Sequence, residues 1–237
     1  MSQSARPPFG AIFDWDGVII DSAKLHEQSW HQLAGELGKS IAPESFIRGF
    51  GMKSAQIIAT IHHWATEPEQ VAGLVQRKEA LYRELVSKSD IRPLPGVVEW
   101  LHRLHEAGAP CAVASSTQRA NIEAVLHRIG LERGFAAIVS AEDVSHGKPD
   151  PEVFLKAAER LELEPQRCLV FEDAYVGIEA GHAAGMKVIA VTTTHMAEEL
   201  RAADLVVRRL DELSLEQTEE LLLQGKLAAG GFPPSQY

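Results

Sequence analysis

The chain has 237 residues and a formal net charge of −10, with 45% apolar and 24% charged residues, which is ordinary for a globular protein with a substantial core. The negative charge argues against a nucleic-acid-binding or membrane-surface protein, because nucleic acids and anionic membranes would repel it. No apolar run approaches the roughly 18 residues of a membrane-spanning helix, and the start MSQSARPPFG lacks a signal-peptide core, so we expect a cytoplasmic protein.

Five short apolar runs are typical of buried parallel strands, because they are nearly continuous rather than alternating. In chain order they are Gly10–Phe13, Pro110–Ala114, Ala136–Ser140, Cys168–Phe171 and Lys187–Val191, and Asp204–Leu210 could add an edge strand. Helix-length amphipathic segments separate most of them, which indicates right-handed crossovers. The predicted fold is therefore α/β, with a doubly wound, Rossmann-like parallel sheet in a core formed by residues 9–21 and 93–225.

The segment from residue 22 to residue 92 interrupts this alternation. It contains no convincing strand, and its apolar residues recur at helical spacing around Leu25–Leu37, Ile57–Trp64 and Val71–Leu85. A helical block inside an alternating chain indicates an inserted α-helical cap domain, and a two-part architecture favours a small-molecule cleft between its parts. Residues 226–237 have the glycine and proline content of a flexible tail.

The first apolar run ends in FDWDGVIIDS, so that Asp14 directly follows the strand and Asp16 comes two residues later. A carboxylate can attack phosphorus to form an aspartyl-phosphate, which divides one difficult displacement into two easier ones. Two carboxylates that approach a phosphate dianion require a cation, and their hard oxygen atoms suit Mg²⁺. Taken alone, the pair is also compatible with two acids that merely cap a loop.

Hydroxyl groups follow the second strand, and a lysine follows the third. Ser115, Ser116 and Thr117 run into a predicted helix, where hydroxyls and free backbone amides can bind an anion. A helix N-cap would explain the same hydroxyls. Lys148 lies in the loop SHGKPDP, where it could neutralise a nucleophile and a transferring phosphoryl group, although surface lysines are common.

Two adjacent acids, Glu172 and Asp173, follow the fourth strand. Acids at a buried strand end are costly unless a cation holds them, so they are candidate Mg²⁺ ligands, with a pair of acidic helix caps as the alternative. Ligands of open parallel sheets bind beyond the carboxyl ends of the strands. The joint occurrence of all four groups at successive strand ends predicts a phosphoryl-transfer site.

These residues resemble the four motifs of the haloacid dehalogenase superfamily. FDWDGVIIDS is similar to its first motif, Ser115 to its second, Lys148 in GKPDP to its third and Glu172–Asp173 to its fourth. The helical insertion resembles the small cap of the subgroup that contains β-phosphoglucomutase, phosphoglycolate phosphatase and several sugar-phosphate phosphatases. The resemblance extends over roughly residues 9 to 194 in motif order, spacing and cap placement.

The resemblance implies that Asp14 is the nucleophile and a Mg²⁺ ligand. It implies that Asp16 protonates the leaving oxygen and then deprotonates the attacking water, while its backbone carbonyl binds the metal. A general acid must be protonated near neutral pH, so we expect the pKa of Asp16 to be raised when the cap closes.

The resemblance also assigns the binding residues. Ser115 and Lys148 would hold the phosphoryl group, aided by backbone amides near Ser116, and Glu172–Asp173 would complete the metal site. His26 matches a histidine that β-phosphoglucomutase carries near its acid/base aspartate, and it could line the closed cleft. An exposed or capping histidine is the alternative.

The segment IRGFGMKSAQII departs from the mutase pattern, because the arginine that the mutase uses for the distal phosphate has no clear match. Arg48 and Lys53 are nearby cations that could serve a substrate instead, and Gln118 stands where the mutase has lysine. These departures favour a Mg²⁺-dependent phosphatase, expected to be monomeric, that acts on a small phosphorylated metabolite of the sugar-phosphate or phosphoglycolate type. A sugar phosphomutase and a catalytically silent binding module are the alternatives.

Overall fold

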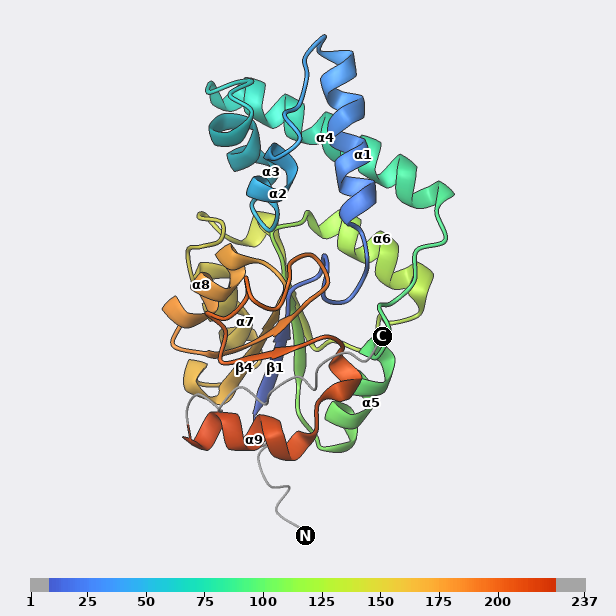
Figure 1. The fold of residues 1–237 in the computed structure, drawn as a ribbon. Helices are drawn as coiled ribbons and strands as arrows, with labels where there is room; N and C mark the ends of the chain where they lie inside the picture. The colour runs from blue at the N-terminus through green and yellow to red at the C-terminus, as the bar shows by residue number, and fades with distance from the viewer. Residues whose placement is uncertain (1–8, 225–237) are drawn as a thin grey trace, which may run out of the picture.

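The computed structural model describes residues 9–224, and a six-stranded sheet lies at its centre (Figure 1). The strand order is β3-β2-β1-β4-β5-β6, and every neighbouring pair is parallel. The strands are β1 (Gly10–Phe13), β2 (Cys111–Ala114), β3 (Ala137–Val139), β4 (Cys168–Glu172), β5 (Lys187–Val191) and β6 (Leu205–Val207). The order reverses between β1 and β4, which confirms the predicted doubly wound sheet and places a ligand site at that junction.

Both faces of the sheet are covered, which explains the continuous apolar character of its central strands. Successive side chains of a strand point to opposite faces, so Phe13 joins one buried cluster while Ile12 joins another. In the first cluster the ring of Phe13 stacks on Phe171 at 4.4 Å between centroids, and Trp100 meets Phe171 edge-on. The sheet is thus a rigid platform between two layers.

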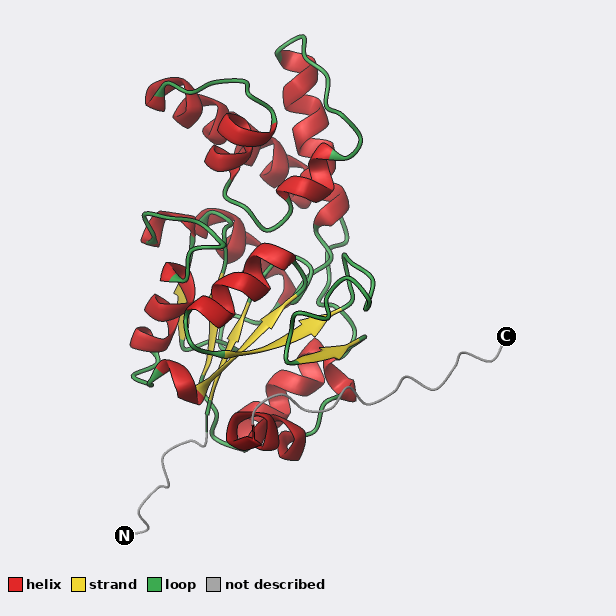
Figure 2. Ribbon diagram, turned by 60° about the vertical axis from the view of Figure 1, so that its left-hand side comes forward, coloured by secondary structure: helices red, strands yellow, loops and turns green. Residues whose placement is uncertain are grey.

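Five α-helices form these two layers in the described core (Figure 2). Three pack against the Phe13 face and two against the Ile12 face. On the Phe13 face lie α5 (Val97–Glu106), α6 (Arg119–Ile129) and α9 (Leu215–Gln224). On the Ile12 face lie α7 (Glu152–Arg160) and α8 (Tyr175–Ala183). Helix α8 approaches the sheet closely, as its small residues predict. A Cβ at Gly181 would lie only 2.6 Å from a methyl of Val188.

The remaining α-helices form a separate layer beyond the carboxyl ends of the strands (Figure 1). We call them the cap, and the rest of the described chain the core. They are α1 (Ala23–Glu36), α2 (Ser45–Gly49), α3 (Ser54–Gln56) with a π-helical turn at Ile57–Ile61, and α4 (Pro68–Lys88). Trp30, Leu33, Ile58 and Leu81 bury a small core of their own between these helices.

The cap contains no strand between residues 22 and 92, as expected. Its three predicted helices correspond to α1, to α3 with its π-helical continuation, and to α4. No helix among residues 9–224 combines the length and the apolar character that a membrane crossing requires. The predicted flexible tail, residues 226–237, lies outside the described residues.

Candidate active site

Asp14 stands at the junction between β1 and β4. Its backbone N–H donates to the carbonyl of Phe171 at 2.9 Å, which continues the strand ladder and fixes the residue in place. The Nζ of Lys148 lies 2.7 Å from Asp14 Oδ1 and 2.6 Å from Glu172 Oε1. Lys148 is only 1% exposed, so it is a buried counter-ion and not a surface lysine.

Burial dominates the protonation of this ion cluster. It raises the pKa of Asp14 to about 7, although the Lys148 ammonium opposes the rise. Burial alone would lower the pKa of Lys148, but the charges of Asp14 and Glu172 outweigh that effect and raise it. Lys148 is therefore charged at neutral pH and shares its charge between two carboxylates.

Three acids converge beside this ammonium group. Asp14, Glu172 and Asp173 each offer a carboxylate oxygen, and these oxygens lie within 4.8 Å of one another. Burial and the charge of Glu172 raise the pKa of Asp173 well above its usual range, and its buried Oδ1 has no hydrogen-bond partner among the described residues. Hard, crowded oxygen atoms with an unpartnered member fit a divalent cation. The set includes three of the four predicted metal residues.

Two glycines make room for these acids. A Cβ at Gly17, where φ is +83°, would lie 1.8 Å from Asp173 Oδ2. A Cβ at Gly177 would lie 1.8 Å from Glu172 Oε1. Any larger residue would collide with a carboxylate, so both positions require glycine for steric reasons, and at Gly17 the backbone conformation requires it as well.

Asp16 lies apart from the acid cluster and is held by donors. Ser22 Oγ and Thr117 Oγ1 each lie 2.5 Å from one of its carboxylate oxygens, and His26 Nε2 lies 3.1 Å from Oδ1. Burial raises its pKa, but the charge of His26 and the three hydrogen bonds outweigh burial and lower it to about 2. The expectation of a raised pKa is wrong for this arrangement, because these donors stabilise the ionised carboxylate.

The hydroxyls after β2 have three different roles. Ser115 is 1% exposed, and its Oγ accepts a hydrogen bond from the Thr117 N–H at 3.1 Å. The Oγ of Ser116 instead donates to the carbonyl of Gly51 in the cap at 2.7 Å. None of these residues is the N-cap of α6, which is Gln118. All three hydroxyl residues line the cleft.

A chain of buried polar groups runs from Asp16 into the cap, and sequence reasoning missed most of it. His26 stacks on Tyr82 at 4.0 Å, and its Nδ1 lies 2.8 Å from Lys78 Nζ. Lys78 also donates to the buried Glu79 at 3.1 Å. A charged residue at apolar spacing on α4 is the signal that could have revealed this chain.

The chain of polar groups then returns to the core. The other carboxylate oxygen of Glu79 accepts from Asn121 Nδ2 at 2.6 Å, and Asn121 Oδ1 accepts from Arg83 at 2.8 Å. Glu79 and Arg83 lie on α4 of the cap, while Asn121 lies on α6 of the core. Asp16 is therefore linked to both parts of the molecule.

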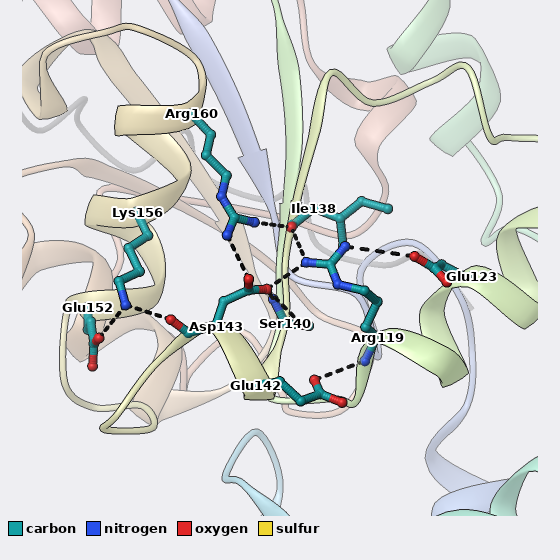
Figure 3. Close-up of polar contacts among 9 residues, drawn as sticks. All are labelled: Arg119, Glu123, Ile138, Ser140, Glu142, Asp143, Glu152, Lys156 and Arg160. Carbon is teal, nitrogen blue, oxygen red and sulfur yellow. Dashed lines mark hydrogen bonds and ion pairs between the residues drawn. The ribbon is translucent and has the colours of Figure 1, made fainter.

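The loop that carries Lys148 is anchored at the residues before and after it (Figure 3). The Asp143 carboxylate accepts hydrogen bonds from Arg119 and Arg160, each at 2.6 Å. The Nζ of Lys156 donates to the carbonyl of Asp143 at 2.5 Å and pairs with Glu152 at 2.7 Å. These contacts fix Asp143 and Glu152 on either side of the loop, which limits where Lys148 can lie.

A cleft of about 680 Å³, including its solvent-open part, lies between the cap and the core. The core lines it with Asp14, Asp16 and the three hydroxyl residues, and the cap contributes His26 as predicted. Besides the Ser116 bond, Lys53 Nζ donates from the cap to the carbonyl of Val144 at 2.8 Å. Lys53 and Arg48 do not line the cleft among the described residues, so the expectation that they serve a substrate gains no support.

A family model described as "Haloacid dehalogenase-like hydrolase" matches residues 11–191. The chain is 42% identical over 214 residues to the chloroplastic 5-amino-6-(5-phospho-D-ribitylamino)uracil phosphatase of Arabidopsis thaliana. That alignment covers 90% of this chain but 57% of the plant protein, so the chain spans little more than half of that relative. It is 35% identical to the fructose-1-phosphate phosphatase YqaB of Escherichia coli (strain K12), over 77% of this chain and 95% of that protein.

Solved structures agree with these sequence matches. β-Phosphoglucomutase from Clostridium difficile superposes with a TM-score of 0.81 at 29% identity, over 91% of this chain and 97% of that chain. The family match begins within β1 and includes the cap helices and the site residues Asp14, Lys148 and Glu172. The chain therefore belongs to the haloacid dehalogenase-like hydrolase family.

Proposed function

We propose that this protein is a metal-dependent phosphatase that hydrolyses a small phosphorylated metabolite through an aspartyl-phosphate on Asp14. One observation carries the proposal. A buried carboxylate at the cleft floor pairs with a buried lysine and lies within 4.8 Å of two further acids, and a second aspartate lies two residues along the chain. The relatives named as phosphatases support the same reaction.

The first half of the reaction transfers the phosphoryl group. An Asp14 oxygen attacks phosphorus, the bond from phosphorus to the alcohol oxygen breaks, and Asp16 gives that oxygen a proton. Asp14, Glu172 and Asp173 would hold the metal, with the Asp16 carbonyl as a further predicted ligand, and Mg²⁺ would supply positive charge against the phosphoryl oxygens. Lys148 supplies a second positive charge, which lessens the repulsion between nucleophile and phosphate.

The second half releases phosphate. Asp16, now ionised, takes a proton from a water molecule, which attacks phosphorus and restores the Asp14 carboxylate. The low pKa of Asp16, about 2, leaves it ionised without substrate at neutral pH. A bound phosphate monoester would raise that pKa, because a nearby negative charge disfavours the carboxylate, and this would supply the protonated acid for the first half.

The cleft favours water over a second sugar hydroxyl as the acceptor. A phosphomutase must also hold the distal phosphate of a bisphosphate. Among the described residues that line the cleft, Lys78 is the only lysine or arginine, and it already contacts His26 and Glu79. No uncommitted lysine or arginine is left there for a second phosphate, which supports hydrolysis.

Two relatives are named for different phosphorylated alcohols. One relative is named for a phosphorylated ribityl chain that carries a uracil ring, and another for fructose 1-phosphate. Four features stay predictions. They are magnesium as the particular cation, a monomeric state, a cytoplasmic location, and the division into a core (residues 9–21 and 93–225) and a cap (residues 22–92).

Phosphate release from a panel of phosphorylated metabolites tests the proposal, with Mg²⁺ or with EDTA. We expect the wild-type protein to release phosphate only with the metal, and Asp14→Asn to lose at least about a thousandfold in kcat. Asp21→Asn, an exposed aspartate in the same loop, should keep its activity. Hydrolysis by Asp14→Asn would overturn the mechanism, and interconversion of glucose 1-phosphate and glucose 6-phosphate would favour the mutase.

A further inference from the structure

The cap end of the cleft is aromatic. Trp30, Phe46, Phe50 and His62 all line it, together with the apolar residues Ile41, Met52 and Ile57. Trp30 meets the His62 ring at 5.2 Å between centroids, and Phe46 meets Phe50 at 5.7 Å, in both cases edge to face. Phe46 and His62 are only partly buried, so their rings have free surface in the cleft.

Two of the polar side chains in the same region are already committed. Ser54 Oγ donates to Glu79 at 2.6 Å, and Lys78 contacts both His26 and Glu79. A sugar ring at this end would therefore bury several hydroxyls against apolar walls with few partners. Each buried hydroxyl without a hydrogen bond costs binding free energy, so the lining does not suit a polyol.

We propose that the cap end of the cleft binds a planar nitrogen heterocycle carried by the alcohol part of the substrate, whose other end bears the phosphate. The inference rests on the proposed phosphatase function and names its substrate class. Phe46 and His62 would contact the ring faces, because aromatic rings stack favourably. Glu27 and His31 line the cleft with exposed side chains that make no hydrogen bond or ion pair among the described residues, and they would contact the polar edge of the heterocycle.

Pairs of esters that share the phosphorylated chain but differ in the ring test the inference. FMN is compared with ribitol 5-phosphate, and uridine 5′-monophosphate with ribose 5-phosphate. An added aromatic contact and the apolar area that the ring buries both favour the ring-bearing ester, so we expect kcat/KM to be about tenfold or more higher for the ring-bearing member of at least one pair. Smaller ratios in both pairs would overturn the inference.

A matched pair of variants locates the effect. Phe46 lines the cleft, whereas Leu74 packs against the same apolar cluster without lining the cleft. Phe46→Leu should lower the ratio of kcat/KM between ring-bearing and ring-free esters severalfold, and Leu74→Ala should leave that ratio unchanged. An equal loss in both variants would mean that cap packing, and not ring contact, sets the ratio. If Phe46→Leu does not fold, the wild-type ratios decide alone.

Binding to the Asp14→Asn protein separates this inference from the proposed function. Calorimetric titration with FMN and with ribitol 5-phosphate, in the presence of Mg²⁺, should give at least about tenfold tighter binding of FMN. Equal affinities would overturn the inference even if every ester is hydrolysed. Absence of hydrolysis of all esters by the wild-type protein would overturn the phosphatase proposal, while the titration would still decide whether the cleft prefers a ring.

Discussion

The two ends of the cleft are built from opposite kinds of interaction. At the core end, Lys148 and the three acids are buried, and the single ammonium offsets only part of their negative charge. At the cap end, neutral aromatic side chains such as Trp30 and Phe46 form the walls. The core end suits a single reaction of a charged group that every substrate shares, whereas the cap end recognises what differs between substrates.

The two ends should also differ in how a substitution changes the free energy of unfolding. Buried charges are stable only when all partners are present, because removal of one leaves an uncompensated charge. Contacts between apolar groups weaken gradually as area is lost. Substitutions at the core end should therefore change the free energy of unfolding more than substitutions that remove a contact between the cap and the core.

Removal of the buried ammonium should have the largest effect on stability. Lys148→Met leaves Asp14 and Glu172 buried without their cation, so we expect the metal-free protein to lose about 3–5 kcal/mol of unfolding free energy. Urea denaturation in EDTA measures this, and Lys24→Met, at an exposed lysine, is the control. Equal stabilities of the two variants would show that the charges at the core end are not coupled.

Removal of a metal-site carboxylate should act in the opposite direction. The raised pKa of Asp173 reflects burial and repulsion from Glu172, so Asp173→Asn should raise the free energy of unfolding of the metal-free protein. The same variant should lose the stabilisation that Mg²⁺ gives the wild-type protein. Thermal unfolding with and without Mg²⁺ checks both parts, and an unchanged response to Mg²⁺ would place the cation elsewhere.

Removal of the polar link between cap and core should have an intermediate effect. Asn121→Ala removes the donor to Glu79 and the acceptor for Arg83, at a cost of about 1–2 kcal/mol. We expect kcat/KM to fall about tenfold with only a modest loss of stability, since Asp16 would be less firmly positioned. Glu123→Gln, on the exposed side of α6, should keep wild-type kinetics, and identical kinetics in the two variants would argue against the link.

The smallest effect is expected at the mouth of the cleft. Ser116→Ala removes one hydrogen bond to the Gly51 carbonyl, worth about 0.5–1.5 kcal/mol. KM should rise by a factor of about two to ten with little change in kcat, if the bond mainly favours the closed cap. A fall in kcat with unchanged KM would instead assign Ser116 to the phosphoryl group, as the sequence predicts.

Sequence alone predicted the sheet and the core end of the site because both follow from local patterns. Apolar runs mark the strands, and parallel strands bring their carboxyl ends together, so Asp14, Lys148 and Glu172 could be placed in one site before any coordinates. The edge strand was also expected, although β6 covers only Leu205–Val207. Helix α2 was missed, because five residues are too few to show a helical period.

The environment of Asp16 could not be predicted in the same way. Its donors come from the loop after β1, from a cap helix and from the loop after β2, so their convergence depends on how the cap meets the core. The wrong expectation for its pKa follows from this, since burial was foreseen and the hydrogen bonds were not. The link through Glu79 to Asn121 likewise joins residues 42 positions apart.

Two of the hydrogen bonds that join the cap to the core are accepted by backbone carbonyls, those of Gly51 and Val144. A backbone carbonyl does not depend on the side chain at its position, so the Val144 acceptor tolerates substitution there, whereas Gly51, with φ +82°, must keep its glycine. None of the aromatic wall residues takes part in either bond. Selection, or a designer, can therefore exchange the walls of the cleft to reach new phosphate esters while closure and the reaction centre stay as they are.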